Sequence, residues 1–142
     1  MLSDTRKNRT LSTCLVVGML VLIWGNSLLT ADISSAISRF VGTLLGGGRQ
    51  MAESSQGHHL LRKLGHFLEF TALGFSLTWR LNLGKRNLSL PLLLGLLAAC
   101  VDETIQRYIP DRSGQVSDVW VDFSGLLLGW CLFRLITRLR KH

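Results

Sequence analysis

The chain has 142 residues, of which 47% are hydrophobic and 18% are charged, and its formal net charge is +7. This composition argues against a soluble globular domain, and the length suits one domain over residues 1–142. The charges cluster between long apolar runs, so the basic excess is typical of anchoring at a membrane surface, and no nucleic-acid partner is expected.

The first long apolar segment covers residues 11–29 and carries no charge. At 1.5 Å per residue it would form a helix of about 28 Å, close to the thickness of the hydrocarbon core. Because Arg6, Lys7 and Arg9 precede it, a cleaved signal peptide is the alternative. A cut before Asp32 would leave Leu29 three positions upstream, which is a poor cleavage site. The sequence therefore favours a retained first span.

The longest loop covers residues 30–62 and contains the triplet Gly46-Gly47-Gly48. Apolar residues recur at helical spacing before this triplet, at Ile33, Ile37, Phe40, Val41, Leu44 and Leu45. This pattern predicts a short amphipathic helix on the outer membrane surface. An irregular loop is the alternative.

Three further apolar segments predict spans over residues 65–83, 89–109 and 117–136. Pro91 falls in the first turn of the third span, where its missing N–H is tolerated, and Pro110 falls where that span should end. The expected fold is therefore an all-α membrane protein, a bundle of four transmembrane helices.

The three cysteines, Cys14, Cys100 and Cys131, lie within apolar runs, without disulfide or zinc spacing. We expect them to be small buried side chains.

The distribution of charge predicts the orientation of the chain in the membrane. With a cytoplasmic N-terminus, ten basic residues lie in short inner segments: Arg6, Lys7, Arg9, Arg80, Lys85, Arg86, Arg134, Arg138, Arg140 and Lys141. Six lie in longer outer segments: Arg39, Arg49, Arg62, Lys63, Arg107 and Arg112. The positive-inside rule then places both termini in the cytoplasm. Of the nine acids, only Asp4 lies on the inner side.

Polar side chains gather in the outer half of each of the last three predicted spans. Arg62, His66 and Glu69 are spaced by four and three residues, which places them on one helical face, with Lys63 one position away.

The third and fourth spans carry similar groups. Gln106 is one turn from both Asp102 and Glu103, and Asp118 is four residues before Asp122. The Gly125–Gly129 pair that follows permits close approach of a neighbouring helix.

Since charge inside a span is costly, these groups are expected to converge in an outward-facing polar pocket. Its candidate ligand-binding residues are Arg62, Lys63, His66, Glu69, Asp102, Glu103, Gln106, Arg112, Asp118 and Asp122. An ion-pair network that only fixes helix packing is the alternative.

At these positions the sequence resembles the VanZ-like family, which is named for a teicoplanin-resistance protein. The resemblance covers residues 11–136 and depends on three motifs: the segment 62–70 (RKLGHFLEF), Asp102-Glu103-x-x-Gln106, and Arg112-x5-Asp118-x3-Asp122-x2-Gly125. Many relatives are expected to have Asn at position 122 and Tyr near position 70. The resemblance implies a four-span protein of the bacterial cytoplasmic membrane, linked to glycopeptide (teicoplanin) resistance or envelope homeostasis.

The first functional hypothesis is a binding module for membrane lipids, a lipid-linked envelope precursor of the peptidoglycan type, or a glycopeptide-related ligand. Arg62, Lys63 and Arg112 would bind its phosphate or carboxylate.

The alternative is an outer-leaflet enzyme. His66 with Glu69 would act as the base and Asp102 or Glu103 as the acid, or these groups would hold a divalent metal.

No nucleophile elbow or H-E-x-x-H spacing is present, so the sequence assigns no catalytic residue, metal site or cofactor. Proton- or ion-coupled transport is a third hypothesis, but four spans are few for a transporter unless the protein forms a homo-oligomer.

Overall fold

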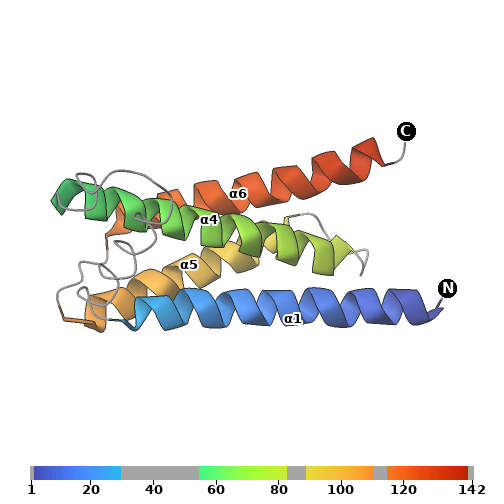
Figure 1. Cartoon of the computed structure of the whole chain (residues 1–142), viewed down its shortest axis with the longest axis horizontal. Coiled ribbons are helices and arrows are strands. Elements are labelled where there is room, and N and C mark those ends of the chain that lie inside the picture. Colours follow the sequence, from blue (N-terminus) through green and yellow to red (C-terminus); the bar gives the residue numbers. More distant parts are fainter. Residues whose placement is uncertain (1, 30–54, 83–88, 111–114, 141–142) are drawn as a thin grey trace.

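The computed structural model describes residues 2–29, 55–82, 89–110 and 115–140. In this part of the chain the regular structure is entirely α-helical, with α1 (Leu2–Ser27), α4 (Ser55–Asn82), α5 (Leu90–Tyr108) and α6 (Val116–Leu139). The four helices run alternately in opposite directions, and the start of α1 and the end of α6 lie at the same end of the bundle (Figure 1). Helix α4 contacts the other three helices. The predicted all-α fold is confirmed.

The observed bounds of α5 and α6 lie within three residues of the predicted spans, whereas α1 and α4 begin nine and ten residues earlier than predicted. Apolarity set the predicted starts, but backbone hydrogen bonding continues through polar residues and does not require apolar side chains. The amphipathic helix predicted over residues 33–45 lies outside the described residues.

Two prolines fix the limits of α5. Pro91 lies in the first turn of this helix. Ile109 has φ −92° and ψ 128°, the extended backbone expected directly before Pro110. The sequence prediction that this helix ends at Pro110 is therefore confirmed.

Two of the described helices are long and apolar enough to cross a membrane: α1 over Arg6–Ser27, and α6. Helix α4 has 28 residues and α5 has 19, but both carry several charged side chains. Length and composition therefore support two of the four predicted spans. By the same measure, α4 and α5 are not singled out as spans.

The bundle carries apolar side chains on its outside, and its interior combines an apolar core with many polar residues. Apolar side chains lie exposed on every helix, among them Val21, Leu68, Leu97 and Leu135, which are 53% to 67% exposed. The interior contains polar residues: Ser12, Ser27, His66, Ser76, Thr78, Asp102, Glu103, Gln106 and Asp122. The hydroxyls of Ser76 and Thr78 donate to carbonyls one turn earlier in α4, which satisfies them without water.

Glycines allow α4 and α6 to pack with their backbones in contact. A Cβ atom at Gly125 would collide with the carbonyl of Phe67, and one at Gly129 with the carbonyl of Thr71. From α4, Gly74 faces the Leu126 backbone in the same way. The glycine pair singled out in the sequence is therefore the contact surface between these two helices.

The prediction for the cysteines is wrong. Cys14, Cys100 and Cys131 are all exposed on outward faces of their helices. Because every helix here is apolar on its outer face, a cysteine within an apolar run can face either outward or inward, and the run does not show which.

Candidate functional site

The end of the bundle opposite the termini holds a group of buried, ionisable side chains. His66 comes from α4, Asp102 and Glu103 from α5, and Asp122 from α6, and each is less than one-tenth exposed. Three helices therefore contribute to one polar interior.

His66 lies between two carboxylates. Its Nδ1 atom is 3.6 Å from Oδ2 of Asp102 and 4.0 Å from Oε2 of Glu69. His66 and Glu69 are nearly one turn apart on α4, as their spacing in the sequence indicated. Both distances are longer than a hydrogen bond. A small side-chain movement would bring the His66 imidazole into hydrogen-bonding distance of either carboxylate.

Gln106 orients the Asp102 carboxylate. Its Nε2 atom donates a hydrogen bond of 2.8 Å to Asp102 Oδ2, one turn earlier on α5. The same atom is 3.2 Å from Oγ of Ser27, at the end of α1. Gln106 therefore connects the site to the first helix.

Asn26 makes a second connection to α1, because its Nδ2 atom donates to Glu69 Oε1 at 3.3 Å. Sequence reasoning missed both Asn26 and Ser27. The available signal was a polar pair at the end of an otherwise apolar run, but its direction depends on how α1 packs.

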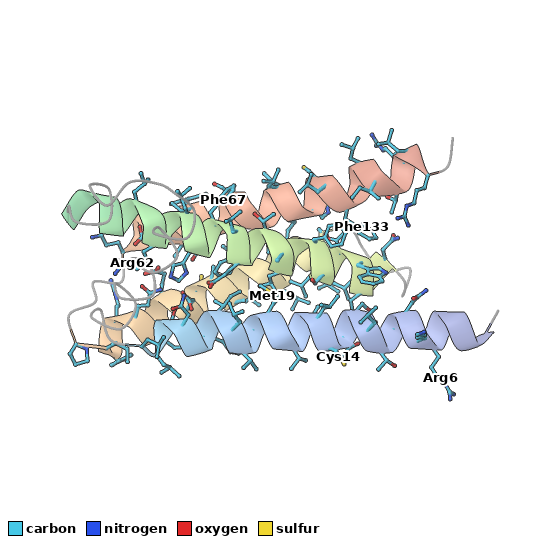
Figure 2. All side chains as sticks on the ribbon, viewed as in Figure 1. Arg6, Cys14, Met19, Arg62, Phe67 and Phe133 are labelled. Atoms are coloured by element: carbon cyan, nitrogen blue, oxygen red, sulfur yellow. The ribbon has the colours of Figure 1, made fainter. Side chains whose placement is uncertain are left out.

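Cations lie at the rim of the site. Nζ of Lys63 forms an ion pair of 2.8 Å with Asp118 Oδ1, and both side chains are partly exposed. Arg62 precedes Lys63 on α4, and Figure 2 shows it at the end of the bundle away from the termini.

These groups enclose a small, partly open pocket. Its lining residues are Arg62, Lys63, His66, Glu103, Gln106, Asp118, Val121 and Asp122. The free space between them holds about one water-sized sphere. The interior therefore suits a single small species, and a larger ligand would contact the rim.

Two buried carboxylate oxygens lack a hydrogen-bond partner among the described residues: Oε2 of Glu103 and Oδ2 of Asp122. The Glu103 side chain does accept a backbone hydrogen bond from Gln115. Buried polar atoms are nearly always paired, so an unpartnered oxygen at this depth calls for a physical explanation.

The structure places all the predicted pocket residues that it describes at this one end of the bundle. Arg112 lies outside the described residues. The tertiary structure adds Asn26, Ser27 and Val121 to the predicted set.

The sequence matches the VanZ/LLP1 family over residues 11–137, which include the whole of α5 and every residue of the site. Comparison with curated proteins and with solved structures gave no match. The family match confirms the resemblance found in the three motifs. The chain belongs to the VanZ/LLP1 family.

Proposed function

We propose that all four helices cross the bacterial cytoplasmic membrane, with both termini in the cytoplasm and the pocket open to the outer leaflet. Family membership and the two strongly apolar helices support a membrane location. The outward faces of α4 and α5 support two further spans, because Leu64, Leu68, Leu97 and Val101 are exposed there while the polar residues point inward.

Reporter fusions test this topology. A fluorescent protein that matures only in the cytoplasm should be bright when fused after residue 140 and dark when inserted at residues 111–114. Brightness at both positions would overturn the orientation.

We propose further that the pocket binds the phosphate or carboxylate of a cell-envelope lipid or a peptidoglycan-precursor-type ligand. The observation that carries this proposal is the placement of Arg62 and Lys63 at the mouth of a buried polar pocket. Lys63 is engaged by Asp118, whereas Arg62 forms no ion pair with a described acid. A guanidinium group presents a planar pair of donors that matches both anions.

Binding of a precursor-type ligand would connect the site to the glycopeptide resistance for which the family is named. The ligand would cover the rim with its anionic group and leave its lipid chain along the apolar outer faces of the helices.

Affinity measurements in nanodiscs test the binding proposal. Full-length protein in neutral lipid is titrated with a short-chain polyprenyl phosphate and with the matching uncharged polyprenol. We expect binding of the phosphate, reduced at least about tenfold by Arg62→Ala, because a hydrogen bond to a charged group contributes about 1.5–3 kcal/mol. Arg107→Ala is the matched control, since Arg107 is exposed at the end of α5 and does not line the pocket.

Two outcomes contradict the proposal. Equal loss in the two arginine variants would show general attraction of anions, and equal affinity for the phosphate and the alcohol would remove any role for the cations.

A second candidate function is catalysis at the outer leaflet, favoured by the position of His66 between Glu69 and Asp102. His66 would act as the general base, with Asp102 or Glu103 as the acid. Incubation of the protein with lipid-linked precursors, with and without chelator, tests it by mass spectrometry. A product that wild type forms and His66→Ala does not would support catalysis, and no product under either condition would exclude it for these substrates.

A further inference from the structure

Three side chains of metal-ligand type meet in the interior of the polar pocket, each from a different helix. His66, Asp102 and Asp122 each offer one ligand atom, and these atoms all lie within 4.8 Å of one another. Neighbouring ligand atoms of a tetrahedral ion are about 3.4 Å apart when each lies about 2.1 Å from the metal, so side-chain movements of about 1 Å would complete the contacts.

Burial separates this triad from an ordinary acidic surface. Asp102 is 0% and Asp122 is 1% exposed. The Oδ2 atom of Asp122 has no hydrogen-bond partner among the described residues, and Oε2 of Glu103 beside it lacks one as well. A buried carboxylate that has an unpartnered oxygen and lies close to a histidine and a second carboxylate is suitably placed to bind a cation.

The charges of the described residues also favour a bound cation. Among the described residues, no lysine or arginine forms an ion pair with Asp122, since the ammonium of Lys63 is engaged by Asp118 and the electrostatic interaction of Arg62 is with Glu103. Buried carboxylates are costly unless they are paired, protonated or bound to a metal. The free space is about that of one water molecule, which suits one ion.

We propose that the pocket holds one divalent transition-metal ion, coordinated by an imidazole nitrogen of His66 and by carboxylate oxygens of Asp102 and Asp122. A mixed set of imidazole and carboxylate favours Zn²⁺ or Mn²⁺ over Mg²⁺ and Ca²⁺, which prefer oxygen ligands. Gln106 holds the Asp102 carboxylate in place, as hydrogen bonds behind a metal ligand commonly do.

This site lies deeper than the anion contacts at Arg62 and does not depend on them. Three protein ligands leave coordination positions open to water or to a ligand oxygen. The sequence predicted that these residues converge, but it could not select these three as one ligand set, because they are 36 and 20 residues apart and only packing decides which atoms meet.

Metal analysis of the full-length protein tests the proposal. The protein is purified in detergent with a tag that contains no histidine, stripped with EDTA, and dialysed against Zn²⁺, Mn²⁺, Mg²⁺ or Ca²⁺. Elemental analysis should find about one Zn²⁺ or Mn²⁺ per chain and substantially less Mg²⁺ and Ca²⁺. Calorimetry should show at least about a hundredfold weaker binding in His66→Ala and Asp122→Asn.

The matched control is Ser124→Ala, because Ser124 is exposed on α6 two residues after Asp122 and does not line the pocket, so this variant should bind metal as wild type does. A variant that fails to fold does not decide the matter, so wild-type protein loaded with Co²⁺ supplies a second measurement. Its visible absorption should show coordination by nitrogen and oxygen, and excess Zn²⁺ should abolish it.

Absence of stoichiometric Zn²⁺ or Mn²⁺ in wild type would overturn the proposal, as would unchanged binding in both triad variants. Binding of the polyprenyl phosphate is measured separately in EDTA, so either proposal can fail while the other holds.

Discussion

The two halves of the bundle differ in what fills their interior. Toward the termini, which we call the apolar half, Phe75 of α4 packs edge-on against Phe133 of α6, with their ring centroids 5.4 Å apart, and Leu77 of α4 is buried. Figure 2 shows Phe133 in this half. Toward the other end, which we call the polar half, the interior contains His66, Asp102 and Asp122. The same four helices therefore enclose a close-packed interior at one end and an ionisable one at the other.

The side chains that stabilise the fold and the side chains that can bind or react therefore lie at different positions along the helix axes. Close packing of apolar side chains stabilises a bundle whatever surrounds it. Buried carboxylates do not stabilise a fold by themselves and are usually found where they bind something. Substitutions in the two halves should therefore have opposite consequences, and four predictions test this comparison.

The largest effect is expected between the halves, where α4 and α6 are in backbone contact. Gly129→Leu should lower the free energy of unfolding by more than about 3 kcal/mol, because its side chain would displace the Thr71 carbonyl and separate the helices. Unfolding by SDS in mixed micelles measures this change. Gly18→Leu is the control, since nothing lies within 4 Å of a Cβ atom there. If both variants lost the same free energy of unfolding, the close backbone contact at Gly129 would not be the cause.

In the apolar half, Leu77→Ala should cost about 2–3 kcal/mol through the cavity that it leaves. The same unfolding assay applies, and folded Leu77→Ala protein should retain full metal and phosphate binding. Leu68→Ala is the matched control on the same helix, because Leu68 is 64% exposed and should change stability little. Loss of binding in Leu77→Ala would show that the two halves are not separable.

In the polar half, Asp122→Asn should change the free energy of unfolding in the opposite direction. Without metal it should raise the free energy of unfolding by about 1 kcal/mol, because it neutralises a buried acid that has an unpartnered oxygen and lies next to another carboxylate. Unfolding in EDTA measures the gain, and metal content measures the loss of binding. A clear loss of stability in EDTA would mean that this carboxylate supports the fold.

The smallest effect is expected at the rim. The Lys63–Asp118 pair is partly exposed, so Lys63→Ala should lower stability by about 0.5 kcal/mol or less. A double-mutant cycle with Asp118→Ala isolates the coupling between the two side chains. A coupling energy well above 1 kcal/mol would show that this pair behaves as a buried ion pair and not as one at the rim.

Much of the fold could be predicted from the sequence. Four helices followed from apolar runs, and the end of α5 followed from Pro110, because both hydropathy and proline geometry are local properties of the chain. The polar residues of α4, α5 and α6 could be assigned to one end, since helical spacing and depth along a span are also local.

Only the tertiary structure decided which faces of the helices meet. The cysteines lie outward, and Asn26 and Ser27 join the site, although the hydropathy of their segments did not indicate which way either set of side chains points. Likewise, His66, Asp102 and Asp122 converge because Gly125 and Gly129 bring α6 against α4 and so set the rotation of α6 about its axis. That rotation depends on contacts between helices far apart in the sequence, whereas helix position and length depend on neighbouring residues alone.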